Sequence, residues 1–293
     1  MTNLFENTSA YWAKYAAYEW RKADNGREYL LPTADATVSV YNTISLADDL
    51  VLDAVNVGLL VFHKSPEQEI KAAIHSFVCN YGLPGMMTAL PTTPKFVEYE
   101  KVYLLKNQFI REESMDTVDY LKLFFPFRMP DFRKRGVESV WDVSGNDRAE
   151  AAMFLTFHNE PQAMTMSFMR GYGEPFEWLK EVFRDWAFAF LCADIYHRER
   201  NRLDQDTLNL YRRGLACFEG NAPTYHLELH DHPVIVWDFH SLMLTVRFLF
   251  SLKMTDKKNP MRTCRHCSKA FYARRTDAQY CSAECRNKAN SKS

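Results

Sequence analysis

The chain of 293 residues lacks the short motifs that mark several common enzyme classes. Its ten glycines form no glycine-rich phosphate-binding loop. The Gly-x-Ser-x-Gly turn of serine hydrolases and the His-Glu-x-x-His helix of zinc proteases are also absent. No pair of carboxylates stands out as an acid and base. The sequence therefore gives no positive sign of an enzyme, and we lean toward a non-enzymatic role.

Long apolar runs are lacking as well. The most apolar segment, residues 239–254, contains His240, Arg247 and Lys253, and it is shorter than the roughly 20 residues that span a bilayer. The first six residues lack the basic start and apolar run of a signal peptide. We therefore expect a cytoplasmic protein without a membrane segment, in which reducing conditions favour metal thiolates over disulfides.

Charge of either sign is not in excess overall, but it is unevenly distributed. The net charge is −1, whereas residues 257–293 carry ten Lys and Arg against two Asp and Glu, or +8. The remainder carries −9. Such a basic end predicts contact with an anion such as DNA or RNA. Alternatively, its basic groups balance the negative charge of metal-bound thiolates.

Four of the seven cysteines lie within the last thirty residues, in two close pairs. Cys264 and Cys267 have two residues between them, Cys281 and Cys285 have three, and thirteen residues separate the pairs. This spacing can bring four thiolates around one tetrahedral zinc ion at about 2.3 Å each. Because four thiolates leave no open position for water or substrate, we predict one structural Zn²⁺. Four reduced, unliganded cysteines are the alternative.

The residues around these cysteines predict a small module that resembles a treble clef. Residues 269–272 favour a strand, in which Phe271 is the one large apolar side chain and is expected to fill the interior of the module. Residues 276–277 favour a turn. Ser282 can cap a short helix that runs to about Asn290. So small a module has almost no core, so zinc binding would drive its folding.

Two stretches carry a family resemblance: Cys264-Arg-His-Cys-Ser-Lys-Ala-Phe271 and Arg274-Arg-Thr-Asp-Ala-Gln-Tyr-Cys-Ser-Ala-Glu-Cys-Arg-Asn-Lys288. They resemble a short four-cysteine zinc finger found at the C-termini of many uncharacterised bacterial proteins. More distantly, they are similar to the CGNR-type finger that follows an all-helical ABATE-like domain in proposed transcription regulators. Here Arg286-Asn287-Lys288 replaces Gly-Asn-Arg, and the second cysteine pair is one residue tighter. The resemblance implies transcription-linked binding of nucleic acid.

Upstream of the finger, periodicity and capping signals predict a mainly α fold of the α+β type, with a few short strands and one hairpin. We expect helices at 46–62, 66–81, 114–125, 147–157, 175–200, 204–218 and 238–254, with Ser45 as the cap of the first. We expect strands at 28–31, 37–41 and 164–168, and a hairpin of 225–229 with 233–237. Residues 96–110 fit either a strand or a short helix. These elements form a helical body, residues 1–255, which precedes the finger, residues 256–293.

Three further features of the body admit a functional and a structural interpretation. Residues 124–135 interleave aromatic and cationic side chains, which suits base stacking but also a proline-broken loop. The hairpin histidines His226, His230 and His232, together with His240 and Asp238, could bind a metal, although hairpin tips are usually solvated. The scattered cysteines, Cys79, Cys192 and Cys217, lie in apolar contexts that predict buried thiols.

The leading hypothesis is a nucleic-acid-associated protein that resembles a transcription regulator. Its body would sense a ligand or dimerise, and four basic residues of the finger would contact phosphates: Arg274, Arg275, Arg286 and Lys288. The second hypothesis is a purely structural finger that caps the body or docks a protein partner. The third is an enzyme whose pocket lies in the body. An outward-facing cluster of the four cations would favour the first hypothesis, and their pairing with acidic groups of the body would favour the second.

Overall fold

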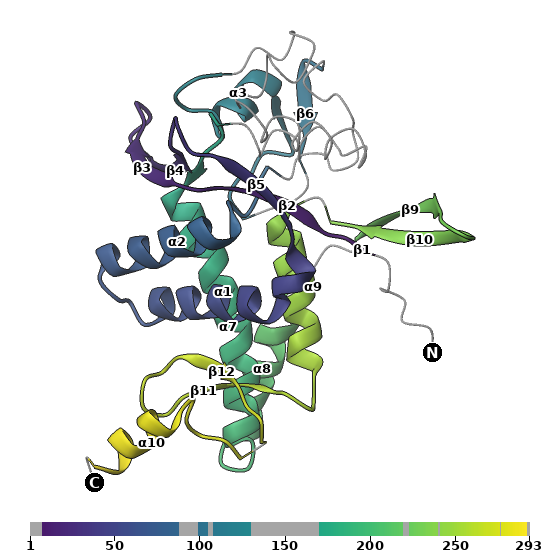
Figure 1. Ribbon diagram of the computed structural model, residues 1–293. Coiled ribbons are helices and arrows are strands. Elements are labelled where there is room, and N and C mark those ends of the chain that lie inside the picture. Colours follow the sequence, from purple (N-terminus) through teal and green to yellow (C-terminus); the bar gives the residue numbers. More distant parts are fainter. Residues whose placement is uncertain are drawn as a thin grey trace. The chain divides into compact units, whose positions relative to one another are not determined.

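The computed structural model describes residues 8–87, 99–104, 108–129, 170–218, 223–239, 241–275 and 277–291 (Figure 1). The chain divides into two compact units. Unit 1 comprises Met1–Ser45, Ile74–Leu179 and Pro223–Thr245, and unit 2 comprises Leu46–Ala73, Lys180–Ala222 and Val246–Ser293. The finger therefore belongs to a unit that also contains helical segments from the middle of the chain.

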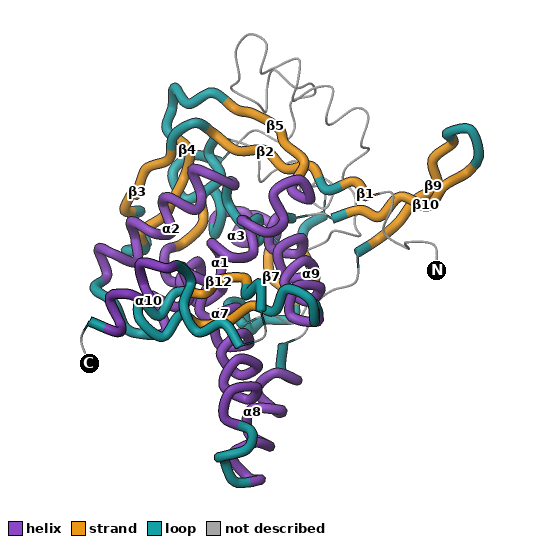
Figure 2. Tube along the Cα trace, turned by 60° about the horizontal axis from the view of Figure 1, so that its bottom comes forward, coloured by secondary structure: helices purple, strands orange, loops and turns teal. Residues whose placement is uncertain are grey.

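The fold is mixed α+β rather than clearly mainly α, as Figure 2 shows by colour. Much of the unexpected strand content lies near the N-terminus, in β2 (Tyr11–Tyr15) and β3 (Tyr18–Lys22). In β2, aromatic side chains on both faces obscure the alternation that marks a strand. In β3, Tyr18 and Trp20 do alternate with Glu19 and Arg21, and the sequence analysis did not use that pattern. The expected strands nearby are confirmed as β4 (Glu28–Pro32) and β5 (Val38–Asn42).

These strands form small antiparallel sheets in unit 1. Strand β2 pairs with β5, and β3 pairs with β4, which also pairs with β8 (Glu174–Pro175). A third sheet joins β6 (Lys101–Tyr103) to β7 (Ser114–Asp116). The described part of the 96–110 segment, residues 99–104 and 108–110, therefore contains a short strand, whereas residues 96–98 and 105–107 lie outside the described residues.

The predicted helices are confirmed wherever the structure describes them, although their ends shift. They are α1 (Ala47–Phe62), α2 (Glu67–Tyr81), α3 (Thr117–Lys122), α7 (Phe176–Glu199), α8 (Gln205–Ala216) and α9 (Leu242–Thr255). The helix expected at 114–125 is shorter because Asp116, the end of β7, caps it by accepting the Val118 N–H at 3.1 Å. No helix within the described ranges is long and apolar enough to cross a membrane.

The start of α1 differs from the prediction. Ser45 is not its cap, because the Ser45 hydroxyl donates to the carbonyl of Asn42 at 2.6 Å. A 3₁₀ turn, η1 (Thr43–Leu46), leads into the helix instead, and Leu46 stands at the cap position without a side-chain bond. Further along α1, a Cβ on Gly58 would lie 1.9 Å from the carbonyl oxygen of Phe183. Glycine thus allows α1 to pack closely on α7 in unit 2.

A carboxyl group lies within the apolar core of unit 1. Glu174 has no exposed surface, and its Oε1 accepts bonds from the Tyr172 hydroxyl and the Met86 N–H, both at 2.6 Å. Its Oε2 is buried without a partner among the described residues. Burial raises the pKa of Glu174 to about 7, although these bonds partly offset that effect.

The predicted hairpin is confirmed as β9 (Thr224–Leu229) and β10 (Pro233–Asp238). Its register pairs Leu227 with Ile235 and Glu228 with Val234. Strand β1 (Thr8–Ser9) runs parallel to β10, so the sheet order is β1-β10-β9 (Figure 1). Strand β9 is therefore the outermost strand of this three-stranded sheet.

The predicted burial of the three scattered cysteines is confirmed for only one of them. Cys192 is buried as expected, whereas Cys79 is half-buried and Cys217 is exposed. Cys217 is the first residue after the end of α8. The expected helix at 147–157, the strand at 164–168 and residues 130–135 of the aromatic and cationic stretch lie outside the described residues, as does His240.

Candidate metal centre

The four C-terminal cysteines converge on one point in unit 2. The Sγ atoms of Cys264, Cys267, Cys281 and Cys285 all lie within 4.8 Å of one another. Within the described part of the chain, this is the only group of three or more metal-binding side chains that meets so closely. The cluster could hold a metal ion, with two ligands from each predicted pair.

The spacing of the sulfur atoms suits tetrahedral coordination. The Sγ atoms of Cys267 and Cys281 are 3.7 Å apart, and those of Cys281 and Cys285 are 3.5 Å apart. A tetrahedron with metal–sulfur bonds of about 2.3 Å has edges of about 3.8 Å. A disulfide would require a separation of about 2.05 Å. The donor set therefore fits a single ion such as Zn²⁺ better than any pairing of the thiols.

The first cysteine pair lies in a tight turn between two short strands. Strands β11 (Met261–Thr263) and β12 (Ala270–Tyr272) are antiparallel, with Thr263 opposite Ala270. Between them, the Ser268 N–H donates to the Cys264 carbonyl at 2.9 Å, and Ser268 has a left-handed φ of 58°. This turn brings Cys264 and Cys267 to one side. The strand predicted at 269–272 is confirmed.

The second pair is held by the start of a helix, as predicted. Ser282 caps α10 (Ala283–Asn290), and its hydroxyl accepts the Cys285 N–H at 3.1 Å. The Cys281 N–H points back at the Cys264 Sγ, 3.4 Å away. In addition, the Arg265 N–H donates to the carbonyl of Gln279 at 2.9 Å and ties the first turn to the second.

The electrostatics of the cluster favour a bound cation. Burial opposes ionisation of Cys264, but the backbone N–H groups of Cys267, Cys281 and His266 outweigh it and lower the pKa of Cys264 to about 6. Burial and the neighbouring thiols together raise the pKa of Cys281 to about 12. One thiolate therefore forms readily, whereas further thiolates repel it. A divalent ion at the centre removes that repulsion.

Phe271 does not fill the interior of the module, contrary to the prediction. It is half-buried, and the buried positions are Met261, Cys264, Ala270 and Ala273. These side chains are small or lie at the ends of the two strands. The module has little core of its own, as expected, and its buried surface comes instead from contact with the rest of unit 2.

Three polar contacts attach the β11–β12 hairpin to the helices of unit 2. Asn56 of α1 makes a pair of bonds with Ala270: its Oδ1 accepts the N–H at 2.8 Å, and its Nδ2 donates to the carbonyl at 3.3 Å. The Thr263 hydroxyl donates to Oδ2 of buried Asp194 in α7 at 2.8 Å. The Tyr272 hydroxyl donates to the carbonyl of Asp48 at 3.2 Å. One side of the finger is thus docked.

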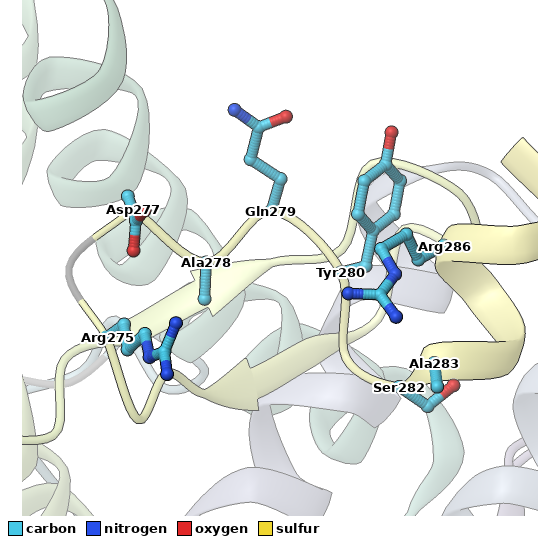
Figure 3. Close-up of a pocket in the computed structure, with 8 residues that line it drawn as sticks. All are labelled: Arg275, Asp277, Ala278, Gln279, Tyr280, Ser282, Ala283 and Arg286. Carbon is cyan, nitrogen blue, oxygen red and sulfur yellow. The ribbon is translucent and has the colours of Figure 1, made fainter. Parts of the chain in front are cut away.

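Residues 274–286 of the finger, which these contacts do not use, carry exposed basic side chains. Arg275 and Arg286 line an open hollow of about 460 Å³, together with Asp277, Ala278, Gln279, Tyr280, Ser282 and Ala283 (Figure 3). Arg274 is also exposed. None of these three arginines forms an ion pair with a described residue. Lys288, by contrast, pairs with Glu284 of the same helix at 2.6 Å.

The histidines of the β9–β10 hairpin do not form a second metal group. His226 Nδ1 lies 2.7 Å from Oδ2 of Asp238, and its Nε2 lies 3.0 Å from Oε1 of Glu228. His230 Nε2 lies 3.0 Å from Oε2 of the same Glu228. The two imidazoles therefore lie on either side of one carboxylate. The sequence analysis did not single out Glu228, although Glu228 alternates with His226 and His230 along the chain.

Comparison with known proteins adds no relative. No family model matches the chain, and neither does any curated protein or solved structure. The resemblance to ABATE and CGNR proteins therefore has no support from these comparisons. Functional inference depends on the site itself.

Proposed function

We propose that the C-terminal module binds one structural Zn²⁺ through Cys264, Cys267, Cys281 and Cys285. The observation that carries this proposal is the convergence of all four Sγ atoms within 4.8 Å. Zinc is the usual ion for four thiolates in tetrahedral geometry, and a site with four protein ligands has no position for a substrate. The ion would hold the turn after β11 against the start of α10.

The proposed role of the zinc-loaded module is to present a basic surface to nucleic acid. Arg275 comes from the segment between the cysteine pairs and Arg286 from α10, and both line the same hollow (Figure 3). Their charges are not neutralised by ion pairs with described residues, so they are available to phosphate oxygens. Tyr280 adds an aromatic ring beside them, which suits stacking on an unpaired base.

A purely structural finger is the second candidate, and the docked side of the module favours it. The paired bonds of Asn56 with Ala270 and the bond of Thr263 with buried Asp194 are typical of a fixed internal interface. The two roles are compatible, because docking uses β11 and β12 whereas the hollow is lined by other residues, among them Arg275 and Arg286. The distinction is whether the arginines bind a phosphate.

Salt dependence of binding tests the nucleic-acid role. The observed affinity for a short DNA or RNA should fall with salt by a slope of about −0.9 per phosphate neutralised on duplex DNA. Changing Arg275 and Arg286 together to Ala should flatten this slope by up to about two units while zinc stays bound. Fluorescence anisotropy with labelled oligonucleotides at several salt concentrations measures the slope, and elemental analysis confirms the zinc.

Lys288→Ala is the matched control, because Lys288 already pairs with Glu284 in α10. We expect it to change the slope less than either arginine does. Absence of binding by the zinc-loaded protein to both DNA and RNA at low ionic strength would contradict the nucleic-acid role. The structural role would then remain.

A further inference from the structure

Strand β9 of the β9–β10 hairpin in unit 1 has one polar face and one apolar face, and on the side of its polar face β10 contributes Val234, Val236 and Asp238. Side chains alternate between the faces of a strand, and the register places residues 225, 227 and 229 opposite 237, 235 and 233. One face is therefore built entirely from apolar residues: Tyr225, Leu227, Leu229, Pro233, Ile235 and Trp237. The other face of β9 carries Thr224, His226 and Glu228.

The apolar face is largely uncovered by the described parts of the chain. Tyr225, Leu227 and Leu229 are 64%, 70% and 80% exposed, and Ile235 is 46% exposed. Removing such apolar side chains from water is favourable. Single exposed leucines are ordinary on protein surfaces, but three large side chains in alternate positions of one strand form a contiguous patch.

The outer edge of β9 is also unpaired within the described residues. Hydrogen-bonded positions alternate along an antiparallel ladder. His230 donates its N–H to the carbonyl of His232, and Pro233 opposite Leu229 has no N–H to donate. Even-numbered residues of β9 therefore bond to β10, and the N–H and C=O groups of Tyr225, Leu227 and Leu229 point outward. An edge of this kind is a template for another strand.

The polar residues of β9 indicate which strand suits this edge. If β9 meets a copy of itself antiparallel, with Leu227 opposite Leu227, the outward groups of both copies bond to each other. His226 then lies opposite Glu228 of the second copy, and Tyr225 lies opposite Leu229. Each imidazole thus meets a carboxylate, and each large apolar side chain meets another on the same face. No like charges face each other.

We propose that β9 pairs with β9 of a second copy of this chain, across a two-fold axis at Leu227, and forms a homodimer. Such an interface is self-complementary and closed, so it uses up the edge instead of extending into a fibre. The polar contacts of His226 with Asp238 and Glu228 form within one hairpin. They hold the side chains on the polar face, where the second copy meets them. This proposal is independent of zinc and of nucleic acid.

The mass of the 293-residue protein in solution tests the proposal. Sedimentation velocity of the unmodified protein over a dilution series should show a species of twice the 34.3 kDa chain mass. Leu227→Lys places two like charges against each other at the axis, so this variant should sediment as a single chain. Ile235→Lys changes the same apolar face on β10, away from the axis, and should remain dimeric.

A charge reversal guards against a variant that fails to fold. His226→Glu sets two carboxylates opposite each other and should weaken the dimer, whereas the double variant His226→Glu with Glu228→Lys should restore it. Circular dichroism checks that each variant is folded. A monomeric unmodified protein at high micromolar concentration would overturn the proposal. So would loss of the dimer in Ile235→Lys as well as Leu227→Lys, because that pattern indicates packing of faces rather than pairing of edges.

Discussion

The two hairpins of the C-terminal third differ in what covers them. The β11–β12 hairpin has three residues per strand, yet Met261 and Ala270 are buried and Asn56 satisfies both backbone groups of Ala270. The β9–β10 hairpin has six residues per strand, and every residue of β9 is exposed. The shorter hairpin is integrated into its unit, whereas the longer one offers an edge and a face.

This difference shows that strand length does not decide how a hairpin is stabilised. An isolated two-stranded hairpin is marginal in water, so each needs something beyond its own ladder. For β11–β12, the additional terms are contacts with α1 and α7 and the proposed zinc ion. For β9–β10, the described contacts include a short parallel pairing with β1, the bonds of His226, Glu228 and His230, the ring contact of Tyr225 with Trp237 and the burial of Val236. The proposed second copy would supply the rest.

Removal of one zinc ligand should have the largest effect on this comparison. Cys264→Ser should abolish zinc binding and disorder β11, β12 and α10, because structural zinc supplies about 10–16 kcal/mol in such modules. The rest of the chain should stay folded. Elemental analysis and amide hydrogen exchange measure the two effects. Cys217→Ser changes an exposed cysteine outside the cluster and should keep the ion. Full zinc occupancy in Cys264→Ser would refute the ligand assignment.

Because Glu174 is buried, we expect the stability of unit 1 to depend on pH. This effect must be distinguished from changes in the stability of either hairpin. The folded pKa of Glu174, about 7, exceeds the ordinary value of 4.5, so the folded state binds the proton more tightly. The contribution of Glu174 to the free energy of unfolding should therefore be fully present below about pH 4.5 and be lost as the pH rises through 7. At higher pH the loss approaches about 3 kcal/mol.

Glu174→Gln tests this pH dependence, because the amide cannot ionise. At pH 8, we expect the variant to unfold at a higher urea concentration than the unmodified protein. At pH 5, the difference between the two urea midpoints should be smaller. Urea titrations at both pH values measure the difference. An equal difference between the urea midpoints at the two pH values would show that Glu174 does not titrate in this range.

A smaller effect is expected from loosening the docked hairpin. Asn56→Ala leaves the buried N–H and carbonyl of Ala270 without their partner, which costs about 1–3 kcal/mol. The Ala270 amide should then exchange faster with solvent while zinc stays bound. Asn56→Asp is the matched control, since it still accepts the Ala270 N–H but no longer donates to the carbonyl, and its effect should be intermediate. Unchanged exchange in Asn56→Ala would show that other contacts hold the hairpin.

Local chemistry made the finger predictable from the sequence. The spacing of the cysteines, Ser282 as a cap and the end of α10 at Asn290 all depend on hydrogen bonds and turns between near neighbours. The same holds for α7, whose apolar residues recur every three to four positions, and for the hairpin at residues 224–238. Aromatic residues on both faces hid β2, and the alternation of β3 was overlooked, so the sequence analysis underestimated the strand content of the α+β fold.

Contacts between distant residues were decided only by the tertiary structure. Asn56 and Ala270 are 214 residues apart, and nothing near either residue predicts their bonds. Glu174 gave no sequence signal, because its burial depends on packing around β8. The outward direction of Leu227 follows from the ladder register, which the side-chain pattern alone does not specify. The sequence by itself determined where the cysteine ligands and the hairpin lie, since both depend on local spacing. Burial and docking required the folded chain, because they depend on which segments meet.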